Sequence, residues 1–339
     1  MNSKLFGRLA IISVLLAVVV VILGAYTRLG DAGLGCPDWP GCYGHLDVPE
    51  AHHEIAKANQ AYPERPVEPA KAWKEMIHRY FAGTLGLLVF FMAAIAIKNR
   101  NDPNQQVAVP VFLAFWIVFQ ALLGMWTVTI KLNPTIVMAH LMGGLTTLSL
   151  LFWISLRHTR VLTEKRLDLT RLNRLHMFSL IALIVVVFQI MLGGWTSSNY
   201  AALACGDYFP MCQAKWWPAM DFKEGFVMWR GTEQNFEFGV LQNDARIAIQ
   251  MTHRIGALIT TIVLITLAFK LIDFRESKCL GKLGTVLLIV LIFQLGLGVA
   301  NIILSLPMTI AVMHNAVGAM LLLVMVAINH AIRPKAEAL

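Results

Sequence analysis

Eight apolar stretches, each long enough to cross a lipid bilayer, dominate this chain of 339 residues. In the first of them, 9–26, Ser13 is the only polar interruption. A helix needs about 20 apolar residues to span the roughly 30 Å of hydrocarbon, and it satisfies its own backbone hydrogen bonds there. We therefore expect an all-α membrane protein. Its predicted transmembrane helices are 9–28, 73–97, 109–130, 135–156, 175–196, 245–272, 283–304 and 307–331.

The composition supports this class. Only 14% of the residues are charged and 57% are hydrophobic, whereas soluble domains carry about 25% charged residues. Lysine and arginine lie at the chain start and in alternate loops, which are cytoplasmic by the positive-inside rule. Both termini are then cytoplasmic, and two long loops, 30–72 and 197–244, lie outside. The net charge of +8 thus reflects membrane topology and predicts no nucleic-acid partner.

Four of the five cysteines form two closely spaced pairs in the outer loops. Cys36 and Cys42 lie in the first loop, and Cys205 and Cys212 lie in the second. Outside the cytoplasm such pairs favour disulfide bonds. A metal site is the alternative, although each loop offers only two thiols, with His45 as the one nearby imidazole.

Several motifs occur twice at a nearly constant offset. Met76-Ile-His78-Arg79 matches Met251-Thr-His253-Arg254, 175 residues later, and His140 matches His314, 174 residues later. The sequence therefore predicts two four-helix bundles as parallel repeats, related by an axis along the membrane normal. The predicted units are an N-terminal half 1–160, a cytoplasmic linker 161–174 and a C-terminal half 175–339.

Four histidines fall inside predicted helices at matching positions of the two halves: His78, His140, His253 and His314. Ionisable residues in membrane spans are costly and mark functional sites by default. Facing imidazoles in a four-helix bundle suit a metal or haem, and histidine is a common axial ligand of haem iron. A zinc site would need more ligands nearby. A hydrogen bond between helices is the alternative role for each histidine.

Three further residues accompany these histidines. Arg79 and Arg254 each follow one of them, and guanidinium groups pair well with carboxylates such as haem propionates. Extension of the arginines to the interface is the alternative. Glu75 lies three residues before His78 and shares its helix face, whereas Gln250 takes this position before His253.

The ordered set of motifs resembles the haem A synthase family over essentially the whole chain. The resemblance rests on Gly24-x-x-Thr-Arg-x-Gly, Cys36-Pro-Asp-Trp-Pro-x-Cys42, Glu75-x-x-His78-Arg79, Ala139-His140, Thr252-His253-Arg254 and Met313-His314-Asn315. It implies an enzyme of the bacterial inner membrane that oxidises the C8 methyl group of haem o to a formyl group. The product, haem a, serves terminal oxidases.

The resemblance also implies how the histidines are used. His253 and His314 are expected to hold a haem b cofactor, and His78 and His140 to hold the substrate haem. Glu75 is then expected to accept a proton or to position water during oxidation. An interfacial glutamate that merely faces water is the alternative.

Implied partners are haem o synthase, cytochrome oxidase assembly proteins, an unidentified electron acceptor and the lipid bilayer, and a homo-oligomer stays open. The rival functions are a membrane b-type cytochrome that carries electrons and a haem transporter or chaperone without chemistry. The second outer loop is long and aromatic, with Trp216, Trp217 and Trp229 among its residues. It is expected either to lie on the membrane surface or to cover the haem pocket.

Overall fold

The computed structural model describes residues 2–103, 105–159, 169–274 and 276–332. Within these ranges eight helices are long and apolar enough to cross a membrane, which confirms the predicted fold class and number of spans. They are α1 (Asn2–Leu29), α3 (Pro69–Lys98), α4 (Ala108–Thr129), α5 (Pro134–Thr159), α6 (Leu169–Ser198), α8 (Asn243–Ile272), α9 (Lys278–Ile303) and α10 (Met308–Ile332). Two short helices, α2 (His52–Ala61) and α7 (Phe222–Gly225), lie in the long loops.

The helix ends follow from local sequence. Pro69 and Pro134 begin α3 and α5, where a missing backbone N–H costs nothing. The tight turn between α4 and α5 places Lys131 and Leu132 at positive φ, and the turn between α9 and α10 does the same with two residues. Left-handed residues of this kind end helices and satisfy their last carbonyl groups.

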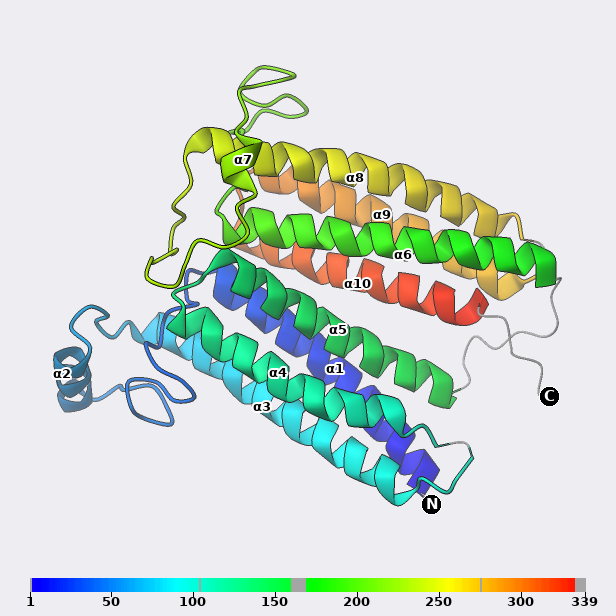
Figure 1. Cartoon of the computed structure of the whole chain (residues 1–339), viewed down its shortest axis with the longest axis horizontal. Coiled ribbons are helices and arrows are strands. Elements are labelled where there is room, and N and C mark those ends of the chain that lie inside the picture. The colour runs from blue at the N-terminus through cyan, green and yellow to red at the C-terminus, as the bar shows by residue number, and fades with distance from the viewer. Residues whose placement is uncertain (1, 104, 160–168, 275, 333–339) are drawn as a thin grey trace.

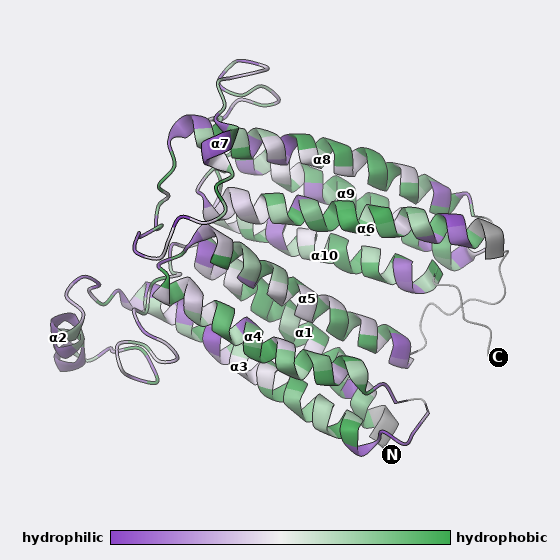
Figure 2. Cartoon of the chain, viewed as in Figure 1, coloured by the Kyte–Doolittle hydropathy of each residue, from purple (hydrophilic) through white to green (hydrophobic). Residues whose placement is uncertain are grey.

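The long helices form two groups that lie side by side (Figure 1). In one group α1 and α4 each pack against α3 and α5, and in the other α8 and α10 each pack against α6 and α9. Helices α1 and α5 contact α10, and α5 also contacts α6, which joins the groups. Apolar residues cover the middle of the helices, and polar residues gather at their ends and in the loops (Figure 2). This distribution suits a multi-pass membrane protein.

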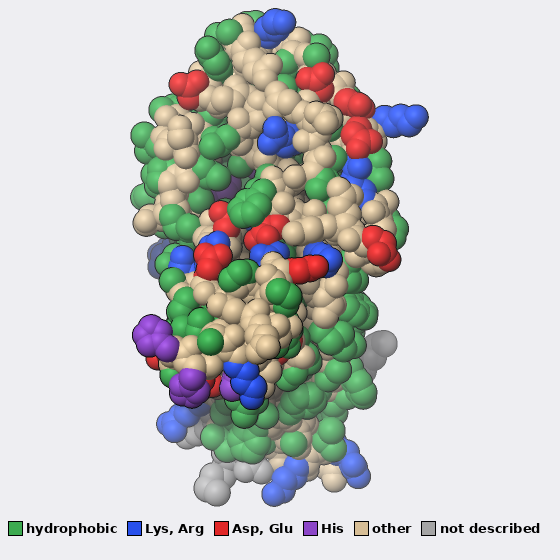
Figure 3. Space-filling view, turned by 90° about the vertical axis from the view of Figure 1, so that its left-hand side faces the viewer, with side chains coloured by type: hydrophobic (Ala, Val, Ile, Leu, Met, Phe, Trp, Pro, Cys, Tyr) green, Lys and Arg blue, Asp and Glu red, His purple; other side chains and the backbone are tan. Residues whose placement is uncertain are grey.

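Both long loops emerge at the same end of the helices, here called the loop end. Phe236 of the second loop is buried against Leu34 and Leu132, and its N–H donates to the Lys131 carbonyl at 3.0 Å. The second loop therefore crosses from α7 onto the turn between α4 and α5. Acidic and basic side chains mix at the centre of this face (Figure 3). An ion pair between Arg65 and Glu237, at 2.6 Å, joins the two long loops.

The first part of the second loop projects sideways beyond α8 (Figure 1) and carries Trp216 and Trp217, both about 70% exposed. The loop thus combines an exposed aromatic segment with a segment that covers the neighbouring helix group. The predicted linker 161–174 falls mostly outside the described residues, at 160–168, and α6 already begins at Leu169.

Candidate functional site

One continuous cavity of about 1660 Å³ runs through both helix groups beneath the loop end. It is lined by all four predicted histidines, by Glu75 and Gln250, and by Arg79 and Arg254. Ligand pockets usually measure about 300–1,000 Å³. The cavity therefore exceeds the volume that one ordinary ligand needs.

The imidazoles of His78 on α3 and His140 on α5 face each other across the first group, with ring centres 6.5 Å apart. Imidazole–metal bonds are about 2.0–2.1 Å long, so two rings on opposite sides of one metal atom have centres a little over ~6 Å apart. The observed spacing fits a single metal atom between the two rings. His253 on α8 and His314 on α10 line the same cavity in the second group.

Each histidine lies against a glycine of the preceding long helix. A Cβ atom added to any of these glycines would lie 3.0–3.2 Å from the imidazole Cε1, so a larger residue would require the ring to shift by a few tenths of an ångström. The pairs are Gly24 with His78 at 3.0 Å, Gly124 with His140 at 3.1 Å, Gly193 with His253 at 3.2 Å and Gly298 with His314 at 3.1 Å.

Three of the histidines also contact a glutamine, one helical turn before the facing glycine. These contacts join Gln120 Nε2 to His140 Nδ1 at 3.1 Å, Gln189 Nε2 to His253 Nδ1 at 3.0 Å and Gln294 Nε2 to His314 Nε2 at 3.3 Å. Gln120 and Gln189 also donate to the backbone carbonyl of the same histidine. Glycines at 143 and 256 leave room for these two amides.

His78 differs from the other three. Val20 occupies the position one turn before Gly24, so His78 has no glutamine partner, and the backbone of Val20 is the group that interacts with its imidazole. A histidine that ligates a metal usually has its other ring nitrogen held by a hydrogen bond. His78 is therefore held by a backbone group, whereas a glutamine side chain contacts each of the other three imidazoles.

Glu75 and Gln250 have the same backbone partner in their two loops. Glu75 Oε2 accepts from the Cys36 N–H at 3.0 Å, and Gln250 Oε1 accepts from the Cys205 N–H at 2.9 Å. Both side chains are buried. Each therefore fixes a disulfide loop over the cavity, while only Glu75 adds a carboxylate, which pairs with Arg79 at 2.5 Å.

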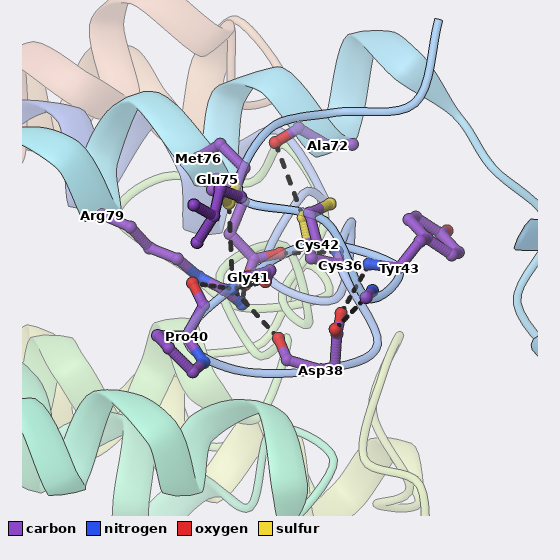
Figure 4. The surroundings of a disulfide bond; sticks show 12 residues. Cys36, Asp38, Pro40, Gly41, Cys42, Tyr43, Ala72, Glu75, Met76 and Arg79 are labelled. Atoms are coloured by element: carbon purple, nitrogen blue, oxygen red, sulfur yellow. Dashed lines mark hydrogen bonds and ion pairs between the residues drawn. A yellow bond between two sulfur atoms is a disulfide. The ribbon is translucent and has the colours of Figure 1, made fainter. Parts of the chain in front are cut away.

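Arg79 and Arg254 both turn toward backbone carbonyls of the disulfide loops. Arg79 Nη1 donates to the carbonyls of Asp38, at 3.0 Å, and Gly41 (Figure 4). Arg254 Nη1 donates to the Met211 carbonyl at 2.9 Å, and its buried Nε has no partner among the described residues. Both arginines thus hold the loops, and Arg254 keeps one donor for another ligand.

Both predicted disulfides are present, Cys36–Cys42 and Cys205–Cys212, which confirms the prediction. Beside each disulfide the backbone forms the same isolated antiparallel β-bridge, between Cys42 and His45 in the first loop and between Cys212 and Lys215 in the second. The two loops therefore share one local structure over their respective halves of the cavity.

The sequence analysis missed the glutamines, although a motif marks them. Phe-Gln-x-x-x-Gly occurs three times, at 119–124, 188–193 and 293–298. It also missed Arg28 and Arg246, which line the cavity and whose buried Nε atoms lack partners among the described residues. Arg28 crosses between the groups and donates to the Ser197 carbonyl at 2.8 Å.

The donor set fits haem. Among the described residues no three metal-ligating side chains of the His, Cys, Asp and Glu types come together, so a bare metal ion would lack ligands. A porphyrin supplies the equatorial ligands of its own iron, and a pair of imidazoles supplies the axial ones. His78, His140, His253 and His314 are the residues that would hold such groups.

Fold and site together define a polytopic helical membrane protein with paired imidazoles suited to haem iron. The model of the cytochrome oxidase assembly protein family matches residues 7–326. The haem A synthase of Shewanella oneidensis is 47% identical, with 94% of each chain covered. That of Caulobacter vibrioides is 26% identical over 93% of this chain and 92% of its own. The chain belongs to the haem A synthase family.

Proposed function

We propose that this chain oxidises the C8 methyl group of haem o to a formyl group and so produces haem a for terminal oxidases. The observation that carries this function is the pair of facing imidazoles, His78 and His140, in a chain 47% identical to a haem A synthase over 94% of its length. The reaction passes through a hydroxymethyl group and an aldehyde hydrate that loses water. The electron acceptor is a partner still to be identified.

The proposed roles of the two helix groups differ. His78 and His140 hold the substrate haem, and His253 and His314 hold a haem b cofactor that supplies redox chemistry. Two asymmetries support this assignment. Glu75 provides a carboxylate only in the first group, and His78 alone lacks a glutamine partner.

We further assign the groups as parallel repeats with both termini in the cytoplasm and the loop end outside the bacterial inner membrane. The charge distribution of the loops supports this orientation. Haem o synthase and oxidase assembly proteins are the proposed exchange partners. The electron-carrier and haem-chaperone alternatives are not favoured, because the similar proteins found are haem A synthases.

Glu75 is proposed to accept a proton or to position water at the substrate methyl group. It lines the cavity one turn from His78, and its carboxylate is held in place by Arg79 and the Cys36 N–H. A fixed base of this kind contributes about 10²–10⁴-fold to a proton-transfer step. Because Glu75 also anchors the loop, a test must separate charge from anchoring.

Glu75→Gln makes this separation, because Gln250 shows that an amide can accept the hydrogen bond from the loop cysteine. We expect the variant to keep its haem b spectrum and to lose most haem a formation, with haem o or the hydroxymethyl intermediate accumulating. Extraction and mass analysis of the bound haems measures this. Gln250→Ala is the control and should lose much less activity. Near-normal haem a production by Glu75→Gln would leave Glu75 with an anchoring role only.

A further inference from the structure

The cavity extends further along α3 than along α8. On α3 its lining runs from Glu75 to Leu87 and Phe90, whereas on α8 it ends at Thr261. With the offset of 175 residues that relates His78 to His253, Phe90 corresponds to Ile265, which does not line the cavity. The first helix group therefore has a cavity extension that the second group lacks.

Small residues open this extension between α3 and α4. Gly83 and Gly86 on α3 correspond to Leu258 and Thr261 on α8, and Ala121 on α4 corresponds to Leu295 on α9. A Cβ added to Gly83 would meet no atom within 4 Å, and one added to Gly86 would meet only Ile117 Cγ1, at 3.9 Å. The space beside these residues is therefore open.

The opening forms an apolar groove on the outer surface of the helices, here called the α3–α4 groove. Its walls carry exposed hydrophobic side chains, Leu87 at 72%, Phe90 at 47% and Val118 at 49% exposed. Thr84, the one hydroxyl beside it on α3, donates to the Tyr80 carbonyl at 2.9 Å. The groove is defined by Gly83, Gly86, Leu87, Phe90, Val118 and Ala121.

We propose that the α3–α4 groove binds the isoprenoid chain of the substrate haem, an inference that rests on the proposed function. Haem o carries a long isoprenoid substituent, and haem b carries none. The groove is continuous with the cavity that holds His78 and His140, and the second group, assigned to haem b, has Leu258 and Leu295 in its place. The asymmetry of the protein thus matches the asymmetry of its two ligands.

The dimensions of the groove agree with this occupant. With a rise of 1.5 Å per residue, Gly83 lies about 7.5 Å and Phe90 about 18 Å along α3 from His78. A flexible chain attached at the edge of the macrocycle can follow this course away from the loop end. Burial of apolar surface favours such binding. Because the groove faces the lipid side, a bilayer acyl chain is the competing occupant.

The test compares two haem probes on the purified full-length protein. Haem o and tail-less haem b are titrated into wild type, Gly83→Leu and Ala121→Leu, with the His253/His314 site filled beforehand. Each substitution introduces the residue found in the second helix group. The control is Gly296→Leu, because Gly296 is exposed on α9, lies outside the cavity lining, and a Cβ there would meet nothing within 4 Å.

We expect each groove variant to weaken binding of haem o at the His78/His140 site at least ~10-fold, by excluding an apolar chain. Affinity for haem b at this site should change less than ~3-fold, and Gly296→Leu should alter neither. Equal losses for both haems, or no loss for haem o, would overturn the proposal; the latter is the result if lipid alone occupies the groove. If the wild-type protein binds haem o more tightly than haem b but makes no haem a, the enzymatic function is rejected and the groove assignment stands.

Discussion

Replacement of Gln189 by leucine should weaken haem binding at His253 without disturbing the fold. Leucine keeps a similar volume and removes both contacts of the amide, to His253 Nδ1 at 3.0 Å and to the His253 carbonyl at 3.1 Å. A histidine that ligates iron through Nε2 carries its proton on Nδ1. In the structure Gln189 Nε2 contacts Nδ1 and donates to the His253 carbonyl. With Nδ1 protonated, the amide must turn its Oε1, which is buried with no partner among the described residues, toward the imidazole.

Two estimates give the expected magnitude. Loss of the group that holds a ligating histidine typically costs about 10–100-fold in metal affinity, or roughly 1.4–2.7 kcal/mol. A buried donor left without a partner costs about 1–3 kcal/mol. The two ranges overlap, because both describe the imidazole N–H that Gln189 would no longer satisfy.

The assay is transfer of haem b from the purified protein to a soluble haem acceptor, followed by absorption spectroscopy. Gln189→Leu should release haem b about 10–100-fold more readily, whereas Gln120→Leu should affect only the haem between His78 and His140. Val20→Leu is the control, because no glutamine acts there. A Gln189→Leu protein that retains haem b within about twofold of wild type would refute this reasoning.

Two other perturbations have defined outcomes. Gly124→Val should weaken haem retention between His78 and His140, because a Cβ there would lie 3.1 Å from His140 Cε1 and displace the ring. Extraction should find haem b still bound, and full occupancy of both sites would contradict the packing argument. Burial raises the pKa of Tyr43 in the first loop from 10.0 to about 12. Its stabilising contribution should therefore be complete below pH 10 and be lost as the pH rises toward 12, which ultraviolet difference titration of wild type against Tyr43→Phe measures; a phenol that titrates near pH 10 would contradict it.

The eight spans were predictable from sequence because hydropathy reports directly on the membrane. The helix ends were less predictable. Helix α3 begins at Pro69, before the predicted start at 73, and hydropathy missed this start because the first turns carry polar residues such as Lys71 and Lys74. A helix can continue beyond the hydrocarbon since its hydrogen bonds are internal, and hydropathy does not detect that continuation.

The histidines were predictable because each is costly in a membrane and because they repeat. The glutamines were not singled out, since the role of Gln189 depends on which helix α6 faces, and only the packing of α6 against α8 brings it to His253. The carbonyl contacts of Arg79 were also missed. They arise because a folded loop leaves backbone carbonyls that need donors, and a linear motif does not contain that information.

Arg28 has a mechanical consequence for the two helix groups. It extends from α1 to the end of α6, where it donates to Ser197 and, at 3.0 Å, to the Tyr200 hydroxyl. Its guanidinium also lies 4.2 Å from the centre of the Tyr200 ring. Hydrogen bonds from charged donors contribute about 1.5–3 kcal/mol each, so sliding α1 against α6 at this end requires breaking them. Movements that widen the cavity at the loop end therefore have to break the contacts of Arg28 first.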